Sequence, residues 1–202
     1  MVMALFTEYI DIYDTTFINT VLLSFSCLIV WLILPILESR FKLITKIINN
    51  DRAKAADYLA YILIHLGSFR NYSFIKLIWN SKQYSLGEMN ILICQVIGII
   101  LGLICIFVYL CASTKLGLRG MYFGDSFGFV LNKGKKITDF PFNYLDHPQY
   151  YCIAGFSFAI SLFFRSPVGI FISSFNAVVL IVLGFFENIE VNKKYSKRDV
   201  SS

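Results

Sequence analysis

His147 and Tyr150 are the residues of this chain whose types and spacing best suit chemistry. They stand in the string His-Pro-Gln-Tyr-Tyr, directly before a long apolar run, so an imidazole and two phenol rings are expected at the mouth of one helix. An imidazole has an ordinary pKa of about 6.5 and exchanges protons near neutral pH. The same position suits a helix cap, because Pro is common in a first helical turn. The sequence leaves both roles open for His147.

Two carboxylates are further candidates. Asp125 lies between two phenylalanines in a glycine-rich stretch, and Glu187 ends the last apolar run. An ionisable group near membrane depth is by default a functional candidate, and a solvated loop carboxylate is the competing interpretation of Asp125. We therefore predict His147, Tyr150 and Asp125 as catalytic residues.

The composition indicates what must position these residues. The chain has 202 residues, of which 57% are hydrophobic and only 15% charged, and its mean hydropathy is +0.66. A soluble domain of this size carries about 25% charged residues. The start of the chain lacks the pattern of a cleavable signal. We expect one membrane domain over residues 1–202, an all-α integral membrane protein of four to five transmembrane helices.

Apolar runs define the expected spans, because about 20 apolar residues cross a bilayer core as a helix. The run after residue 147 is split by Arg165-Ser166-Pro167, and Pro disfavours continuation of the helix before it. This break predicts a C-terminal helical hairpin. The expected spans are approximately residues 15–37, 58–79, 89–114, 148–164 and 166–186.

The basic residues predict the orientation. With a hairpin, most of the 18 Lys and Arg residues fall on one face, in residues 38–57, 113–147 and the tail after 186. The positive-inside rule places this face in the cytosol. A single span in place of the hairpin weakens the bias. The hairpin also returns Glu187 to the face of His147, as a site at the membrane interface requires.

Other motifs narrow the class. The five cysteines form no CxxC pair and lie near no histidine cluster, which argues against a disulfide framework or a metal site. Dinucleotide and P-loop fingerprints are absent, and no nucleic-acid partner is expected. Gly117 and Gly120 follow the third long apolar run, where glycines admit either a ligand or a tightly packed helix.

Several strings resemble the phospholipid N-methyltransferases, which convert phosphatidylethanolamine or its monomethyl form towards phosphatidylcholine. The strings are LGLRGMYFGDSFGFVL, TDFPFNYLDHPQYY, RSPVG and FFEN, with YIDIYDTTF near the start, so the likeness spans nearly the whole chain. The His-Pro-Gln-Tyr element is also similar to the His-Pro-x-Tyr of the more distant isoprenylcysteine carboxyl methyltransferases.

The resemblance implies S-adenosyl-L-methionine as methyl donor, a phospholipid acceptor entering from the bilayer, and residence in the endoplasmic reticulum membrane with the site facing the cytosol. Ile104 and Cys152 replace glycines of the family pattern, and Asn188 replaces an acid. The cofactor-binding positions that the resemblance implies are Gly102, Leu103, Ile104, Gly117, Gly120, Glu187 and Asn188.

Methyl transfer to a neutral amine requires proximity, alignment and loss of the amine proton. From the resemblance, we expect Glu187 to bind the cationic amino group of the cofactor. Tyr150 or Tyr151 is expected to face the sulfonium in a cation–π contact. His147 is expected to accept the amine proton. Two alternatives remain open: a methyltransferase for another membrane-bound acceptor, such as a prenylated cysteine, and a non-catalytic or degenerate lipid-binding homologue, which the replacements at Ile104 and Asn188 favour.

Overall fold

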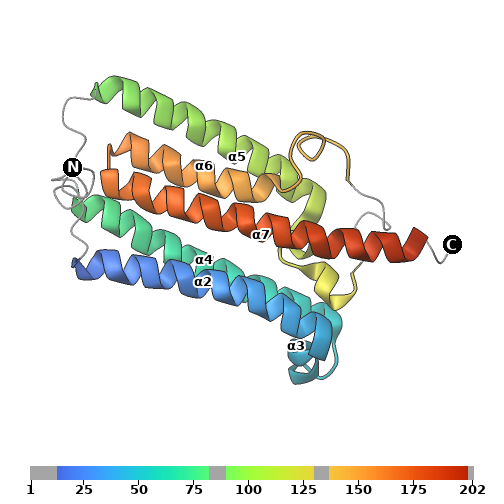
Figure 1. Cartoon of the computed structure of the whole chain (residues 1–202). Helices are drawn as coiled ribbons and strands as arrows, with labels where there is room; N and C mark the ends of the chain where they lie inside the picture. The colour runs from blue at the N-terminus through green and yellow to red at the C-terminus, as the bar shows by residue number, and fades with distance from the viewer. Residues whose placement is uncertain (1–12, 82–89, 130–136, 200–202) are drawn as a thin grey trace.

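The computed structural model describes residues 13–81, 90–129 and 137–199, and this part of the chain is built from helices alone (Figure 1). The predicted all-α class is confirmed, and each predicted apolar run corresponds to one long helix. In chain order the elements are α2 (Thr15–Phe41), α3 (Leu43–Ile47), α4 (Arg52–Asn80), α5 (Ile91–Met121), the 3-10 helix η2 (Gly124–Phe127), α6 (Pro148–Phe163) and α7 (Pro167–Asp199).

Short polar side chains fix where the helices begin. The carboxylate of Asp14 accepts from the amide of Thr16 at the start of α2. Asp51 and Asn90 do the same for α4 and α5, each bonding two amides of the first turn. Glu38, only 1% exposed, accepts from the amide of Ile44 at 2.8 Å and so fixes the corner between α2 and α3. These bonds satisfy amides that have no partner within their own helix.

The predicted hairpin is present. α6 ends at Phe163 and α7 begins at Pro167. Between them Arg165 takes a left-handed conformation (φ 53°), and the hydroxyl of Ser166 accepts from the amide of Gly169 at 3.0 Å. The polar tail does not end this helix, which continues past the apolar run to Asp199.

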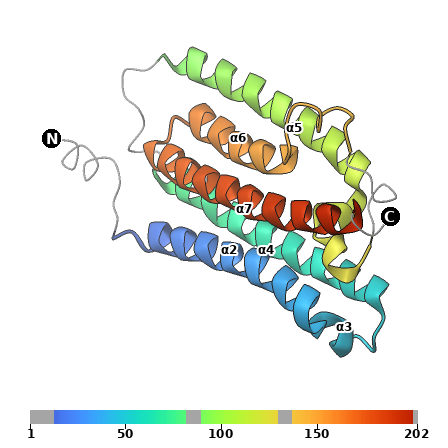
Figure 2. The same ribbon diagram turned by 45° about the vertical axis from the view of Figure 1, so that its right-hand side comes forward.

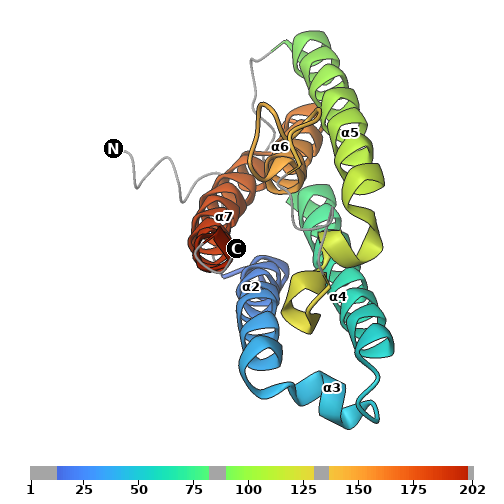
Figure 3. The same cartoon turned by 90° about the vertical axis from the view of Figure 1, so that its right-hand side faces the viewer.

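The helices run side by side, with α6 packed between α5 and α7 and with α2 packed on α4 (Figure 3). Figures 1 and 2 place α3, η2 and the C-terminal end of α7 at the same end of the bundle. We call this the α3 end. It is the end on which the sequence predicts most of the basic residues. The hairpin turn and the start of α2 lie at the other end.

Three of the described helical segments are long and apolar enough to cross a membrane: Thr15–Phe41, Ile91–Met121 and Pro167–Phe185. The outer faces are strongly apolar, as the exposure of Leu103 (63%) illustrates. This pattern fits an integral membrane protein, whose lipid-facing side chains are as apolar as its interior.

Small residues let α5 and α6 approach closely. A Cβ added to Gly98 would lie 2.8 Å from the carbonyl oxygen of Ala159, and one added to Gly155 would lie 2.6 Å from Sγ of Cys105. Buried apolar clusters close the two ends of the bundle: Leu77, Ile78 and Ile172 at the hairpin end, and Ala55, Leu59 and Phe127 at the α3 end. All five cysteines lie in the described residues, and none forms a disulfide.

Candidate active site

His147 immediately precedes α6, and its imidazole stacks on the ring of Tyr150. The ring centroids are 5.5 Å apart with an interplanar angle of 22°. The backbone carbonyl of His147 accepts from the amide of Tyr150 at 3.1 Å, whereas its side chain makes no capping hydrogen bond to the helix. Of the two roles that the sequence left open, the side-chain cap is therefore not formed. Tyr150, 6% exposed, holds the imidazole against the bundle.

Gly184 of α7 lies against this stacked pair. A Cβ at this position would be 3.1 Å from Cδ2 of His147 and 3.5 Å from Cδ2 of Tyr150. Any other residue would crowd the imidazole. No sequence pattern singles out Gly184, because its importance depends on how α6 and α7 pack together.

A cavity of about 230 Å³ surrounds the pair between α6 and α7. Its wall combines a carboxylate, an imidazole and aromatic rings on an otherwise apolar surface. Such a mixture suits a small cationic ligand, since carboxylates attract positive charge and aromatic faces stabilise it. The lining residues are Asp146, His147, Tyr150, Tyr151, Ala154, Ala177, Leu180, Ile181, Gly184 and Phe185.

Gly117 redirects the chain near the end of α5. Its backbone angles (φ 64°, ψ 176°) interrupt the helix and fall in a region that essentially only glycine occupies. The helical turn after this bend contains Gly120, which is partly buried. The chain then enters η2, where a Cβ on Gly124 would lie 2.6 Å from the carbonyl oxygen of Arg119. The glycines predicted from the sequence thus shape the path of the chain at the α3 end.

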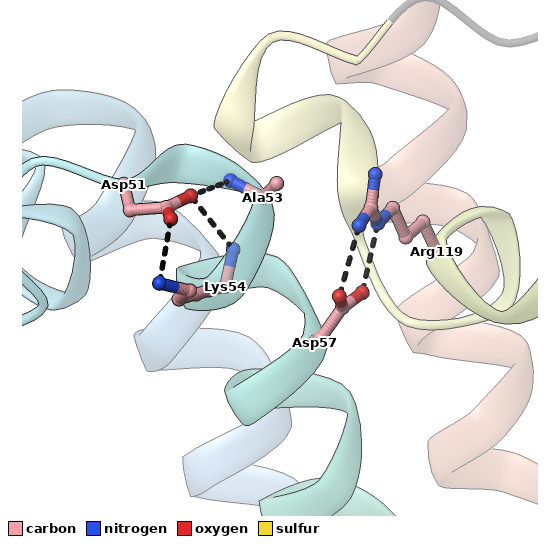
Figure 4. Close-up of polar contacts among 5 residues, drawn as sticks. All are labelled: Asp51, Ala53, Lys54, Asp57 and Arg119. Atoms are coloured by element: carbon pink, nitrogen blue, oxygen red, sulfur yellow. Dashed lines mark hydrogen bonds and ion pairs between the residues drawn. The ribbon is translucent and has the colours of Figure 1, made fainter.

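An ion pair attaches residues 117–127, which we call the bent segment, to α4. Nε and Nη2 of Arg119 donate to the two carboxylate oxygens of Asp57 at 2.8 Å and 2.9 Å (Figure 4). The guanidinium also lies 4.7 Å above the ring of Phe129. The hydrogen bonds from Arg119 hold the pKa of Asp57 below its usual value. Sequence reasoning did not find this pair, because a contact across 62 residues leaves no local pattern.

The Phe-Pro-Phe-Asn string forms a turn that leads to the site. The amide of Phe142 donates to the carbonyl of Asp139 at 2.8 Å, and the ring of Phe140 lies 6.1 Å from that of Phe107 on α5. Nζ of Lys115 bonds the carboxylate of Asp139 at 2.8 Å and holds its pKa below the usual value. These contacts place the residues before His147 beside the end of α5.

Three predicted cofactor positions lie apart from the His147 cavity. Gly102 packs against α6, and its Cβ position is 3.6 Å from Cβ of Ala159. Ala159 is about 18 Å along α6 from His147, at roughly 1.5 Å per residue. Leu103 and Ile104 are 63% and 55% exposed on the outer face of α5. The structure therefore does not bring this string together with His147.

Three other predicted residues can be placed only by their backbone. Asp125 is in η2, and Glu187 and Asn188 are in α7, but their side chains lie outside the described part of the structure. Glu187 follows Gly184 by three residues, which is less than one helical turn. Its backbone is therefore close to the His147 cavity, as the sequence predicted for the end of the hairpin.

Comparison with known proteins identifies the family of this chain. The profile of the phospholipid methyltransferase family matches residues 93–198, which include nearly all of α5, α6 and nearly all of α7. This chain belongs to the phospholipid methyltransferase family. The predicted family and the prediction of an enzyme are thereby confirmed.

Named relatives agree with this assignment. Phosphatidylethanolamine N-methyltransferase A of Dictyostelium discoideum is 28% identical over 193 residues, covering 94% of this chain and 86% of the relative. Phosphatidyl-N-methylethanolamine N-methyltransferase of Neurospora crassa is 25% identical, covering 84% and 77%. Phosphatidylethanolamine N-methyltransferase of Rattus norvegicus is 26% identical, covering 89% and 87%. No solved structure matches this phospholipid methyltransferase.

Proposed function

We propose that this protein transfers methyl groups from S-adenosyl-L-methionine to the amine of phosphatidylethanolamine and of its mono- and dimethyl forms, towards phosphatidylcholine. The observation that carries the proposal is the His147–Tyr150 stack in the wall of a cavity with a carboxylate and aromatic rings, inside the region that matches the family. A proton acceptor beside a cation-stabilising ring is what methylation of an amine requires.

The donor set of the cavity fits S-adenosyl-L-methionine. Asp146 would hold its ammonium group, and Tyr150 and Tyr151 would face its sulfonium. From the family resemblance, we also propose that Glu187 and Asn188 contact the cofactor, with Gly117 and Gly120 shaping the bent segment. When bound, the cofactor supplies an electrophilic methyl group.

The residues of the chain supply positioning and proton transfer. A lipid ammonium has no free electron pair, so its proton must leave before the nitrogen can be methylated. His147 takes that proton, and its stacking on Tyr150 fixes the plane of the imidazole. Tyr150 presents its ring to the positive charge that accumulates on the nitrogen, a contact of about 0.5 to 2 kcal/mol. We propose that Asp125 orients the lipid amine from the bent segment.

We propose that the α3 end faces the cytosol and that the protein resides in the endoplasmic reticulum membrane. The support is the excess of basic residues in the segments of that end. A lipid of the cytosolic leaflet then presents its headgroup towards the α3 end of the bundle.

The sequence alternative of a degenerate homologue rested on Ile104 and Asn188, which depart from the family pattern. The position of Ile104 weakens this reading. Its side chain is 55% exposed on the outer face of α5, so it does not fill the His147 cavity.

The test uses purified protein in lipid with methyl-labelled S-adenosyl-L-methionine. Phosphatidylethanolamine and its mono- and dimethyl forms are offered separately, and a prenylated cysteine peptide tests the other acceptor class. We expect label in the phospholipids alone. Folded protein that labels none of the three lipids would show that the proposed function is wrong.

A paired substitution tests the cofactor contact. We expect Glu187→Ala to abolish labelling and Glu190→Ala, in the same helix, to retain it. Both variants are checked for insertion and folding. Full activity of Glu187→Ala would remove the proposed role of this carboxylate.

A further inference from the structure

A second, larger cavity of about 460 Å³ lies inside the bundle. Side chains from α2, α4, α5, α6 and α7 line it, and most are apolar, for example Leu63, Phe74 and Ile160. Leu180 lines both this cavity and the His147 cavity, so the two are neighbours. We call this larger cavity the bundle cavity. The methyl transfer proposed above does not involve it.

The bundle cavity opens sideways between α4 and α5. Lining residues on both helices are also exposed on the outer surface: Ser68 and Asn71 on α4, and Ile106 and Leu110 on α5. Ile106 and Leu110 are 44% and 56% exposed. The α5 side of the opening is therefore apolar and faces the hydrocarbon of the bilayer, whereas the α4 side carries the polar residues Ser68 and Asn71. A ligand that enters here comes from the membrane.

Arg70 is the charged residue in the wall of this cavity. It lies 12 residues after Tyr58 and 9 residues before Trp79, the two ends of the predicted span, which is about 18 Å and 14 Å at roughly 1.5 Å per residue and places it inside the bilayer core. The guanidinium is partly buried and donates from Nε and Nη2 to the amide oxygen of Asn71, at 3.3 Å and 2.8 Å. Among the described residues it forms no ion pair, and no carboxylate lines the cavity.

A guanidinium at this depth is costly unless an anion or polar partner meets it. Arginine remains charged and presents a planar set of donors that matches the oxygens of a phosphate. The apolar walls suit acyl chains, and the lateral opening faces lipid. A glycerophospholipid combines both parts in one molecule, an anionic phosphodiester on two hydrocarbon chains.

We propose that the bundle cavity is the binding site for the acceptor phospholipid, with Arg70 and Asn71 binding its phosphodiester. Naming the bound lipid as the acceptor rests on the proposed function, whereas the phosphodiester site itself does not. The bound lipid enters between α4 and α5, and its amine extends past Leu180 towards His147.

Gly67 offers a way to block the cavity without disturbing the fold. It lines the cavity, and a Cβ added there meets nothing within 4 Å. Gly67→Leu therefore fills the space that the lipid would occupy. Lys76→Gln is the matched control for Arg70→Gln, because Lys76 is exposed on the same helix and does not line the cavity.

The experiment measures photocrosslinking of a photoactivatable phosphatidylethanolamine to the purified full-length protein without methyl donor. Unlabelled phosphatidylethanolamine, diacylglycerol with the same chains and inorganic phosphate are the competitors. We expect Arg70→Gln to weaken lipid binding roughly tenfold or more, the effect of a charge-assisted hydrogen-bond pair. Gly67→Leu should abolish binding, and Lys76→Gln should leave it unchanged. Only phosphatidylethanolamine should compete.

Kinetics then identify the bound lipid. Arg70→Gln should raise KM for the amine lipid by a similar factor, with KM for the methyl donor unchanged. Unchanged lipid binding in Arg70→Gln, equal competition by diacylglycerol, or displacement by inorganic phosphate alone would overturn the proposal, as would an unchanged lipid KM. If lipid binding follows Arg70 but no methyl is transferred, the phosphodiester site stands and the proposed function fails.

Discussion

Arg119 and Asp57, 62 residues apart, are joined by two parallel hydrogen bonds that attach the bent end of α5 to the first turns of α4. A two-pronged pair fixes direction as well as distance. Both side chains are more than one-third exposed, so solvent screens the pair and it adds little stability. Its main effect is to hold the bent segment in place.

We therefore expect Arg119→Ala to lower methyl transfer several-fold while shifting the unfolding midpoint only slightly. The charge swap Arg119→Asp with Asp57→Arg should recover part of the activity, because the ion pair forms again in reverse. Lys115→Ala, which removes the exposed pair with Asp139, is the control and should have less effect. A swap variant no more active than Arg119→Ala would contradict the positioning role.

The same pair gives a pH dependence with a defined sign. The pKa of Asp57 is lowered in the folded protein from its ordinary value of 3.8. The stabilisation is therefore complete above that value and is lost as the pH falls through the folded pKa. Below about pH 4, wild type should lose stability more steeply than Asp57→Asn. Parallel unfolding curves of the two proteins from pH 6 to pH 3 would show that the pair contributes nothing.

We expect substitution by Ala to change the free energy of unfolding in opposite directions at Gly117 and Gly67. Gly117→Ala places a Cβ in a backbone region that essentially only glycine occupies, and should destabilise the protein by about 1 to 3 kcal/mol. Gly67→Ala has open space around the new Cβ within an ordinary helix and should stabilise it by about 0.5 to 1 kcal/mol. Denaturant titrations in a fixed detergent measure both free energies of unfolding. A Gly117→Ala protein as stable as wild type would contradict the bend.

The local apolar pattern of the sequence was sufficient to predict the helices of this protein. It was insufficient to predict where the chain bends and which distant residues contact each other. The Arg165-Ser166-Pro167 break predicted the hairpin, because a proline disfavours continuation of the helix before it, although α2 accommodates Pro35 in its interior. The apolar pattern did not predict that α7 continues beyond residue 186 to Asp199. The hydropathy of a segment indicates where the chain leaves the membrane. It does not indicate where the helix ends, because a helix can continue into water.

The sequence could predict those parts of the candidate site whose functional residues lie close together in the chain. Tyr150 follows His147 by three residues in the first turn of α6, so their closeness follows from the local sequence. Gly184 and Arg119 owe their roles to packing between distant elements, and no pattern in their own strings indicates it. In the sequence Arg70 only interrupts an apolar run, and the fold alone places it in the wall of a cavity.

Gly98 and Gly102 allow packing to be separated from ligand binding. Gly98→Ala would set a Cβ 2.8 Å from a backbone oxygen of α6, whereas Gly102→Ala has ordinary contact distances of 3.6 Å or more. We expect Gly98→Ala to destabilise the protein by about 1 to 3 kcal/mol and Gly102→Ala to leave stability unchanged.

Activity of the Gly102→Ala protein then decides its role. If Gly102 only packs helices, methyl transfer and KM for S-adenosyl-L-methionine should remain near wild type. A stable Gly102→Ala protein with a strongly raised cofactor KM would place this string at the cofactor, as the family resemblance implies, and would require that the cofactor reach beyond the His147 cavity.

His147 should determine the rate of methyl transfer. The lipid nitrogen can be methylated only after its proton has left, and His147 is the proposed proton acceptor. His147→Gln should therefore lower kcat by about 10² to 10⁴-fold. His65→Gln is the matched control, because His65 is exposed on α4 and lines neither cavity.

Two substitutions of Tyr150 separate the contribution of its ring from that of its hydroxyl in the same assay. Tyr150→Phe keeps the face that stacks on His147 and should retain most of the activity. Tyr150→Leu removes that face and should lower the rate by about 2- to 30-fold, equivalent to the 0.5 to 2 kcal/mol of a cation–π contact. Equal loss in the two variants would assign the effect to the hydroxyl. A His147→Gln protein that keeps the wild-type rate would show that the proton leaves by another route, and His147 would then only position Tyr150.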